Sequence, residues 1–478
     1  MTEMLRPLAP LLITAATIVI AMLAIAIRRN KRLVAGISMI GVSAALVALL
    51  PAVLAGDTSA TPVTSLLVLD GVSRLGMVMV LVAALGVLVL CIGYFERFAG
   101  QREELYLLIL TGTLGAQTLV CAQHVASLLL GLELLGVPLV GAIAYFAHQR
   151  AVEAGIKYLI LSAAASGTLL FGAALIFADT GSLELARFGA AIATAGIDAP
   201  LVATGAAMML AGFAFKLSLV PFHQWTPDVY EGAPVPVTAF LATVGKVGPV
   251  IAVLRIFDGT LVSSVVAGGF WVLALASLLV GSVLALRQTN LKRLLAYSSV
   301  AHFGYIAAVI SLPGVTSQIV AVYLMSYVIT SIGVFGVLCL ASGEPGVADR
   351  ERLVDWQGFF WEHPALAVAL VGMLLSLAGI PLTVGFVGKL VVISVNVSAA
   401  EWLLIGGIVF ASLVGAFYYL RVVGLLLQPA AGASSVPALE GRVPAAGSAL
   451  LLVSAALTIG LGIFPEPLFD WARQFVLR

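Results

Sequence analysis

Long apolar runs separated by short polar loops dominate this chain. A helix that crosses a bilayer needs about 20 apolar residues, and fourteen runs of that kind occur. Backbone polar groups inside lipid must pair within their own element, so each run predicts a helix. The first run has no small-residue cleavage site, which favours a retained helix. The runs cover residues 8–27, 33–54, 70–93, 104–122, 124–147, 151–178, 200–222, 235–257, 264–286, 291–311, 316–341, 364–397, 402–425 and 446–465.

Two of the predicted helices contain an interruption at proline. The seventh runs into Leu219-Val220-Pro221-Phe222-His223, and the unusually long twelfth contains Gly379-Ile380-Pro381-Leu382. Proline removes a backbone donor and clashes with the preceding turn, so both helices should kink or break. Interrupted helices at corresponding positions are typical of inverted repeats and lie near an ion path. We therefore expect two five-helix repeats, segments 4–8 and 9–13, although two ordinary proline kinks would give the same spacing.

The repeats divide the chain into four predicted parts. These are an N-terminal three-helix segment (1–103), a first repeat (104–257), a second repeat (264–425) and a C-terminal helix with a short tail (426–478). The chain has 478 residues, of which 62% are hydrophobic and 10% charged, whereas soluble globular domains have roughly 25% charged residues. The composition excludes a soluble enzyme and predicts an all-α integral membrane protein.

Few other chemistries find support in the residues. The net charge of +1 gives no electrostatic basis for nucleic-acid binding. Neither a G-x-x-x-x-G-K-S/T loop nor a G-x-G-x-x-G turn occurs, so nucleotide binding has no support in the sequence. The three cysteines, Cys91, Cys121 and Cys339, lie in apolar runs and match no disulfide or C-x-x-C pattern. No His, Cys or carboxylate cluster has metal-ligand spacing, so we expect no metal site.

The basic residues predict the orientation of the helices. Of 24 Lys and Arg residues, most fall in alternate loops, and basic loops stay in the cytoplasm. Both termini should then face outward, on the periplasmic side of a bacterial inner membrane. The predicted cytoplasmic set is Arg28, Arg29, Lys31, Arg32, Arg97, Arg102, Arg150, Arg287, Lys292, Arg293, Arg350, Arg352, Arg421 and Arg442, and the outer set is Arg6, Arg74, Arg187, Arg255, Arg473 and Arg478.

Four lysines and one glutamate lie within or at the edge of apolar segments instead. A charge at mid-bilayer costs at least about 3 kcal/mol on insertion scales, so these groups should face one another, water or the bundle interior. Burial disfavours the charged form of a lysine and a nearby carboxylate favours it. A lysine whose carboxylate partner approaches and withdraws is therefore a switchable proton carrier. The five residues are Glu133, Lys157, Lys216, Lys246 and Lys389.

We expect Glu133 to partner Lys216, with Lys246 as the next site and Lys389 as the last. The alternative is a structural role, in which the lysines cap carbonyls freed at the breaks or extend to the membrane surface. That alternative is strongest for Lys157, which lies near a helix end, and weakest for Lys246, which lies deep in its span.

Two histidines add a possible relay. His302 lies in the middle of the tenth segment, and His223 follows the break at Pro221. A neutral imidazole both donates and accepts, which suits proton transfer between lysines. Packing through a single hydrogen bond is the alternative for His302, and a position at the cytoplasmic surface is the alternative for His223.

The stretch from Lys216 to Lys246, KLSLVPFHQWTPDVYEGAPVPVTAFLATVGK, resembles the antiporter-like subunits of respiratory complex I. The fifth (LLLGLELLGVPL), sixth (GIKYLILSAAASGTLLFG), tenth (RQTNLKRLLAYSSVAHFGY) and twelfth (LAGIPLTVGFVGK) segments are similar too. The resemblance implies fourteen helices with two inverted five-helix repeats. It matches Glu133 and Lys216 to the family's ion pair, Lys246 to its central lysine and Lys389 to the ionisable residue of the second broken helix. Many relatives have two adjacent prolines where this chain has only Pro381.

The same resemblance implies a proton-translocating, non-redox subunit of an NADH:quinone oxidoreductase. No cofactor is expected on this chain, and NADH, FMN, iron–sulfur clusters and quinone would belong to partner subunits. The expected partners are other complex I membrane subunits, of the antiporter-like M type and the small K type, and the lipid bilayer. A subunit of a multisubunit cation/proton antiporter, a subunit of a hydrogenase-type complex and a purely structural bundle remain alternatives.

Overall fold

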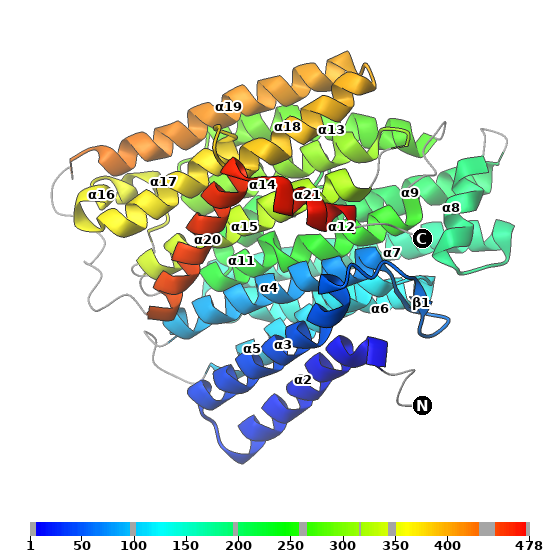
Figure 1. The fold of residues 1–478 in the computed structure, drawn as a ribbon, viewed down its shortest axis with the longest axis horizontal. Helices are drawn as coiled ribbons and strands as arrows, with labels where there is room; N and C mark the ends of the chain where they lie inside the picture. Colours follow the sequence, from blue (N-terminus) through cyan, green and yellow to red (C-terminus); the bar gives the residue numbers. More distant parts are fainter. Residues whose placement is uncertain are drawn as a thin grey trace.

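Helices that lie side by side make up almost the whole molecule (Figure 1). The computed structural model describes residues 6–95, 102–194, 199–257, 265–314, 317–342, 350–429 and 445–474. The first half of the chain contains η1 (Arg6–Leu8), α2 (Ala9–Ile27), α3 (Lys31–Leu54), α4 (Gly71–Phe95), α5 (Glu103–Cys121), α6 (Val125–Ile143), α7 (Gln149–Thr180), α8 (Leu185–Thr194), α9 (Pro200–Leu217), α10 (Trp225–Gly232), α11 (Val235–Ala242) and α12 (Val244–Phe257).

The second half is helical in the same way. It contains α13 (Val265–Leu286), α14 (Leu291–Ile310), α15 (Ser317–Ala341), η2 (Leu353–Trp356), α16 (Phe359–Glu362), α17 (Pro364–Ala378), α18 (Val384–Ser398), α19 (Trp402–Leu427), α20 (Ala445–Ile463) and α21 (Glu466–Arg473). In the described residues, the strands are limited to one antiparallel pair, β1 (Thr61–Pro62) with β2 (Val68–Leu69), in which Thr61 faces Leu69.

The expected number of membrane segments is confirmed. Within the described ranges, thirteen spans are long and apolar enough to cross a membrane, and one of them, Val235–Phe257, combines α11 and α12. The twelfth predicted segment forms two shorter apolar helices, α17 and α18, of 15 residues each. Together these account for the fourteen predicted segments. The predicted C-terminal tail includes a further short helix, α21.

The helices begin where polar side chains bond their first backbone donors. Asn30 accepts from two backbone N–H groups at the start of α3, and Asn290 accepts from one at the start of α14. His124 and His148 use their ring nitrogens in the same way at the starts of α6 and α7. These caps satisfy donors that a helix end leaves unpaired, so short polar loops are sufficient between the spans.

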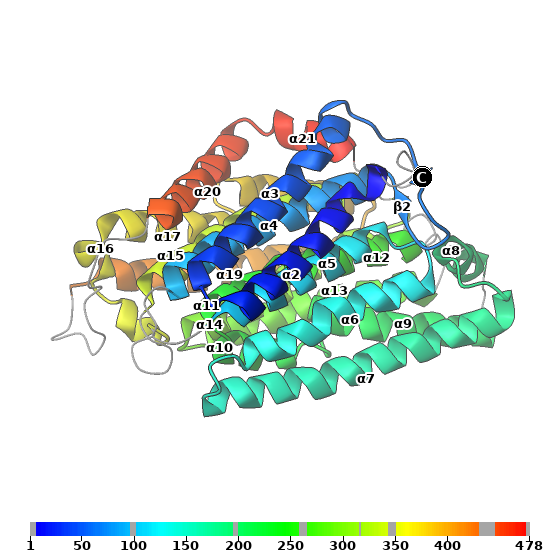
Figure 2. The same ribbon diagram turned by 90° about the horizontal axis from the view of Figure 1, so that it is seen from below.

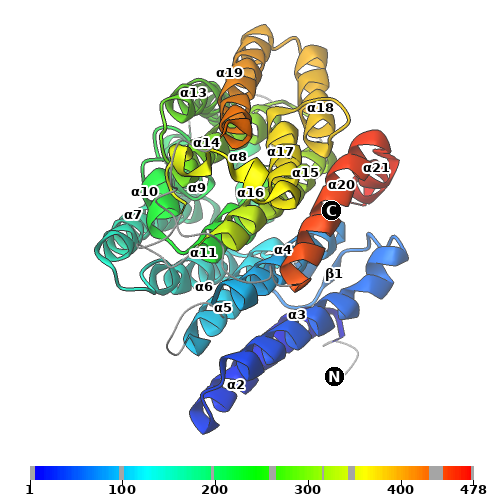
Figure 3. The same ribbon diagram turned by 90° about the vertical axis from the view of Figure 1, so that its left-hand side faces the viewer.

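The N-terminal helices and the C-terminal helix flank the central helices. Figure 3 shows α2 and α3 at one side of the bundle, next to α4 and α5. Helix α20 packs against α15, α17, α18 and α4. Glycine allows one especially close contact, between α7 and α9: a Cβ at Gly172 would lie 2.5 Å from the carbonyl oxygen of Gly205.

The loops predicted to be cytoplasmic meet at one end of the bundle. Arg29 lies 2.7 Å from Glu104, and Arg150 lies 3.1 Å from Glu351, while an isolated bridge joins Asn290 to Arg352. The other end is the one that carries β2 and α8 (Figure 2). Three arginines used to predict the orientation, Arg97, Arg442 and Arg478, lie outside the described residues, and the orientation in the membrane stays a prediction.

Both predicted interruptions occur. Helix α9 ends at Leu217, Ser218 takes a left-handed backbone with φ of 61°, and α10 begins at Trp225. Helix α17 ends at Ala378, Gly379 has φ of 83°, and α18 begins at Val384. The second break is complete although only one proline is present.

A third interruption was not predicted. Thr243 leaves helical geometry between α11 and α12, three residues before Lys246. Its side-chain hydroxyl bonds the carbonyl of Ala239 at 2.7 Å, one turn back in α11.

Candidate functional site

Lys246 is the most enclosed charged residue of the site. Its side chain comes from the first turn of α12 and is completely buried. The ammonium group donates to the backbone carbonyl of Lys216 at 2.9 Å and to the hydroxyl of Ser218 at 2.5 Å. It also lies 5.0 Å from the ring centre of Trp225 and 5.1 Å from that of Phe303. Two acceptors and two aromatic faces partly replace its lost hydration.

This lysine bonds a group that the broken helix leaves free. The carbonyl of Lys216 belongs to the last turn of α9, which cannot continue past Ser218. Lys246 therefore caps a carbonyl that the break leaves free, which is the structural role expected as the alternative for a buried lysine. It does not exclude a second role, because capping requires one donor and an ammonium group has three.

Lys216 lies in the last turn of α9, and its side chain is 7% exposed. The ammonium group donates to the hydroxyl of Ser162 on α7 at 2.7 Å. No ion pair within 4.0 Å joins it to Glu133 in the described part of the chain, although Glu133 is near enough to act on it electrostatically. A Cβ at Gly136 would lie 3.4 Å from the Lys216 ammonium, and Gly136 shares a face of α6 with Glu133.

The predicted pair is therefore apart in this structure. The Ser162 hydroxyl bonds the Lys216 ammonium instead. The half-buried Glu133 lies about one helical turn before Gly136 on α6. The lysine side chain is long and flexible, so a rotation could move its ammonium group between the serine and the glutamate.

Lys389 occupies an equivalent place at the second break. It lies on α18, its side chain is 6% exposed, and its ammonium group donates to the carbonyl of Ala378 at 2.8 Å. Ala378 is the last residue of α17, just before the left-handed Gly379. The ring of Tyr305 lies 5.3 Å from the ammonium. At each break, therefore, a lysine from a later helix bonds a carbonyl of the helix that ends: Lys246 comes from α12 and Lys389 from α18.

His302 lies between the breaks on α14, surrounded by hydroxyl groups. Its Nδ1 is 2.7 Å from the hydroxyl of Tyr323 and its Nε2 is 3.4 Å from that of Tyr419. The Tyr419 hydroxyl also contacts the hydroxyl of Ser298. The next residue on α14 is Phe303, whose ring centre lies 5.1 Å from the Lys246 ammonium.

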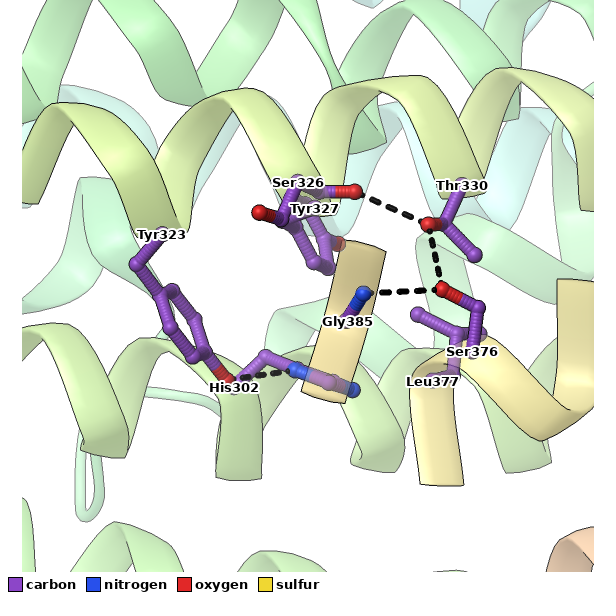
Figure 4. Close-up of a pocket in the computed structure, with 8 residues that line it drawn as sticks. All are labelled: His302, Tyr323, Ser326, Tyr327, Thr330, Ser376, Leu377 and Gly385. Atoms are coloured by element: carbon purple, nitrogen blue, oxygen red, sulfur yellow. Dashed lines mark hydrogen bonds between the residues drawn. The ribbon is translucent and has the colours of Figure 1, made fainter. Parts of the chain in front are cut away.

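A small cavity, lined mainly by residues that carry polar groups, opens beside His302 (Figure 4). Its volume for the centre of a water molecule is about 10 Å³, close to what one water needs. Thr330 bonds Ser376 at 3.1 Å, and Ser376 accepts from the backbone N–H of Gly385 at 3.1 Å, beyond the second break. The lining residues are His302, Tyr323, Ser326, Tyr327, Thr330, Ser376, Leu377 and Gly385.

Lys157 is not enclosed with the other lysines. Its side chain is 43% exposed and pairs with Glu153 at 2.7 Å and with Asp228 at 2.8 Å. Asp228 also pairs with Arg293 at 2.7 Å. These groups line a polar cleft of about 240 Å³, at the end of the bundle where Arg150 meets Glu351. The cleft joins α7 and α10 of the first predicted repeat to α14 of the second.

His223 is half-buried in the loop between α9 and α10. Its ring centre lies 6.1 Å from that of Tyr297. Within the described residues, no side-chain hydrogen bond or ion pair joins it to Lys216, Lys246 or His302. The structure thus places Lys216, Lys246 and the region around His302 and Lys389 next to one another in the buried interior. Lys157 and His223 lie at the edge of this region.

The candidate site is built from side chains that can hold and release protons. In the described ranges, no group of three or more His, Cys, Asp or Glu side chains is placed to hold a metal ion. The site consists of amines, hydroxyls, one imidazole and one carboxylate in apolar surroundings. Such groups accept and release protons without redox chemistry.

Sequence reasoning missed most of the hydroxyl groups. Ser162, Ser218 and the tyrosines on α15 and α19 contact the predicted carriers. A search for serine and tyrosine at helical spacing within apolar segments could have found Ser298, Ser299 and Tyr305 near His302. It could not have predicted contacts that depend on how separate helices pack.

A model of one protein family matches residues 122–415, and its description is "NADH:quinone oxidoreductase/Mrp antiporter, TM". This range includes all seven residues that the sequence predicted for the site, from Glu133 to Lys389. A relative from Chromohalobacter salexigens, named NADH-quinone oxidoreductase subunit N, is 45% identical over 479 residues, and the match covers 100% of both chains.

Solved structures share the fold. A chain of respiratory complex I from Thermus thermophilus, solved with bound aureothin, has a TM-score of 0.82 at 30% identity, covering 96% of this chain and 98% of that one. A chain of the Mrp complex from Dietzia sp. DQ12-45-1b has a TM-score of 0.84 at 22% identity, covering 98% of this chain and 97% of that one.

Proposed function

Since the chain belongs to the NADH:quinone oxidoreductase and Mrp antiporter membrane family, we propose that it is a proton-translocating subunit, of the subunit N type, of a bacterial NADH:quinone oxidoreductase. The observation that carries the proposal is the series of buried lysines at broken helices. Lys216, Lys246 and Lys389 are each at most 7% exposed. Removing three amines from water has a large energetic cost, which a proton-carrying role explains.

The first step of the proposed mechanism is a change of partner at Lys216. In the observed state Ser162 holds the amine. When the amine turns toward Glu133, the carboxylate stabilises the ammonium form, and when it turns back that form is less favoured. Energy from quinone reduction elsewhere in the complex would shift this equilibrium through the packed neighbours. This chain itself contributes no redox step.

Lys246 and Lys389 are the next carriers, with His302 between them. Loss of a nearby positive charge at Lys216 favours protonation of Lys246, and its gain favours release. His302 contacts two tyrosine hydroxyls and a cavity with room for about one water, so it can accept on one nitrogen and donate from the other. Lys389 would receive the proton at the second break.

Lys157 and His223 are proposed at the entrance of this route. The cleft around Lys157 is polar and open, and Lys157 precedes Ser162 by about one and a half turns of α7. His223 lies in the loop beside Pro221. Both positions suit water-exposed groups that deliver protons to Lys216, with both termini on the opposite, periplasmic side of the bacterial inner membrane.

Partner subunits would supply the redox cofactors and cover part of the apolar surface of this chain. Neighbours of the M and K types would contact the exposed apolar helices, and other subunits would hold NADH, FMN, the iron–sulfur clusters and quinone. Two short helices of this chain carry large exposed side chains at their ends, such as Trp361 and Trp471. We expect lipid or partner subunits there, and no nucleic acid.

A subunit of a multisubunit cation/proton antiporter is the second candidate. The fold match to the Mrp chain favours it, because the same buried lysines would serve an exchanger without an electron donor. A hydrogenase-type complex would use the same path. The 45% identity to a protein named subunit N supports the first candidate.

The deciding experiment identifies what the chain assembles with. We would tag it in its native host, purify it in mild detergent, and identify the polypeptides by mass spectrometry. The proposal expects iron–sulfur and flavin subunits and NADH:quinone activity in one complex. Recovery with antiporter subunits alone, in preparations without NADH oxidation, would contradict it.

A further inference from the structure

Two hollows lie along α7, where this helix packs against α9 and α10. Figure 2 shows α7 at the outer edge of the bundle. One hollow is the polar cleft around Lys157, and the other, which we call the apolar hollow, has a volume of about 380 Å³. Ligand-binding sites in proteins have volumes of roughly 300–1,000 Å³. The apolar hollow has this size and no part in the mechanism above.

The two hollows follow the same face of α7. The lining residues of this helix, from the polar cleft to the apolar hollow, are Arg150, Glu153, Ala154, Lys157, Leu161, Ala164, Ala165 and Thr168. Steps of three or four residues connect one turn to the next, so all of them share one face of the helix.

The opposite wall has the same spacing. Gln224 and Trp225 line the apolar hollow, and Asp228 and Glu231 of α10 line the polar cleft. They too follow one another at helical spacing. Because both walls are shared, the two hollows are the two ends of one groove between α7 and α10.

The apolar end of the groove needs no polar ligand. Among its lining residues, only Thr168, Gln224 and Trp225 have polar side chains. The Thr168 hydroxyl donates to the carbonyl of Ala164 at 2.8 Å, and the Trp225 indole N–H donates to the carbonyl of Phe215 at 3.0 Å. These two donors are satisfied within the protein, so an apolar occupant fits this end best.

The length of the groove matches one leaflet of a bilayer. Lys157 is the last charged residue on the α7 wall, and Thr168 follows it by eleven residues, which is about 17 Å along the helix. One leaflet contributes about half of the ~30 Å hydrocarbon core. The polar cleft lies at the end of the bundle that is predicted to be cytoplasmic, so the apolar end extends from that membrane surface toward the midplane.

The apolar end opens toward lipid. Ile160, Leu161 and Phe222, three large apolar side chains near its mouth, are exposed in the described structure. Water does not fill an apolar hollow of this kind, and an unfilled hollow loses the contacts of its lining atoms. An acyl chain is the apolar molecule that the surrounding bilayer supplies.

The charges of the polar cleft indicate the headgroup. Three basic and three acidic residues line it: Arg150, Lys157, Arg293, Glu153, Asp228 and Glu231. Asp228 and Glu231 both pair with Arg293. The side chains of Arg150 and Glu153, on α7, are 68% and 58% exposed. Arginine and lysine bind phosphate, and a carboxylate accepts from an ammonium group. Because the charges balance, the cleft suits a headgroup that carries both signs.

We propose that this groove binds one phospholipid with a zwitterionic, ethanolamine-type headgroup. Arg150 and Lys157 would bind its phosphate, and Glu153 would accept from its ammonium group. One acyl chain would fill the apolar hollow against Phe215 and Trp225. The proposal does not rest on the proposed function, because it concerns the shape and charge of an outer surface.

The bound chain would contact two rings that lie next to the buried lysines. Phe215 and Trp225 both line the apolar hollow. The ring of Phe215 lies 5.8 Å from the Lys216 ammonium, and the ring of Trp225 lies 5.0 Å from the Lys246 ammonium. An acyl chain in the hollow would exclude water from these two rings and restrict their movement.

The test uses the whole complex, purified through a tag on this chain. The complex is placed in vesicles that contain phosphatidylethanolamine with a photoreactive group on one acyl chain. It is then dissolved and washed in detergent, so that loosely held lipid is removed, and irradiated. Mass spectrometry of the peptides locates the label. We expect the label within residues 161–168 or 211–225.

Two alanines of α7 provide a matched pair of variants. Ala164 lines the apolar hollow, whereas its exposed neighbour Ala163 does not. Ala164→Phe fills the hollow and should reduce the label several-fold, while Ala163→Phe should retain it. Equal labels in the two variants would show that the chain lies outside the hollow and would overturn the site.

A second lipid tests the headgroup. Phosphatidylglycerol with the same photoreactive chain should label the groove several-fold less. Glu153→Gln should reduce the ethanolamine label and leave the glycerol label unchanged, because only the former loses a partner. Equal labelling of the unaltered complex by both lipids overturns the proposed headgroup, and this comparison stands even if a variant fails to assemble. Absence of label from the groove with both lipids, whether a partner subunit covers it or not, overturns the site. The readout is bound lipid, so a failure here leaves proton translocation untouched.

Discussion

The ammonium group of Lys246 lies 2.9 Å from the backbone carbonyl of Lys216 and donates a hydrogen bond to it. Two lysines that the mechanism uses in sequence are thus joined through the main chain of the broken helix. The side chain of Lys216 points instead to Ser162. A shift of α9 would therefore change the hydrogen bonds of both lysines, as a coupled pair of proton carriers requires.

The first prediction concerns Ser218, which combines a left-handed backbone with a hydroxyl bound by Lys246. Glycine accepts such a backbone freely, whereas alanine costs about 1–2 kcal/mol there. Ser218→Gly should therefore unfold at a higher temperature than Ser218→Ala. Both should slow proton translocation, because both remove the oxygen. Thermal unfolding and vesicle acidification of the purified complex measure the two effects. Normal translocation in Ser218→Gly would exclude a role for the hydroxyl.

Gly379 provides a second prediction, on the other break. Its φ is 83°, and a Cβ there would lie 2.7 Å from the side chain of Lys389. Gly379→Ala should destabilise the protein by about 1–2 kcal/mol and displace the lysine, with a loss of translocation. Gly406→Ala is the control, because a Cβ at that exposed helical position meets nothing within 4 Å. Equal melting temperatures for the two variants would contradict the account of the break.

Glu133 should matter through its charge. Glu133→Gln keeps the shape of the side chain but cannot stabilise the ammonium form of Lys216, so we expect slower translocation. Glu133→Asp keeps the charge and should retain more of the rate. The measurement is the initial rate of NADH-driven acidification of the vesicles. The proposed change of partner is wrong if the glutamine variant equals the parent.

Lys157 should behave differently from the enclosed lysines. It is 43% exposed and holds Glu153 and Asp228, and exposed ion pairs contribute about 0–1 kcal/mol. Lys157→Arg should retain both pairs and the full rate. Lys157→Ala should lower the rate less than Lys246→Ala and change the melting temperature little. A loss in Lys157→Ala as complete as in Lys246→Ala would place Lys157 among the essential carriers.

Much of the fold follows from the sequence because the bilayer restricts the choices. Apolar length predicts the spans, and Pro221 and Pro381 mark the two breaks through their missing donors. The break at Thr243 was not predictable in this way, because no proline lies at the position. It depends on the packing of α11 and α12 among their neighbours.

The candidate site was predictable in its ionisable members, the lysines, Glu133 and His302, but not in its hydroxyl groups. Lysines in apolar segments are conspicuous, so Lys216, Lys246 and Lys389 could be selected from the chain alone. Their partners could not be selected. Ser162 lies 54 residues from Lys216 in sequence, and Lys389 bonds a backbone carbonyl that carries no sequence signal. The distance between Lys216 and Glu133 likewise depends on the rotamer of a flexible side chain.

The central claim is that Lys246 carries protons as well as capping the broken helix. Lys246→Ala removes both roles, so Lys246→Gln serves beside it, because its amide can still donate to the Lys216 carbonyl but cannot hold a proton. The most direct measurement is the number of protons translocated per electron by the assembled complex in sealed vesicles. The account predicts a clear decrease in both variants. An unchanged ratio in assembled complexes of both variants would contradict it.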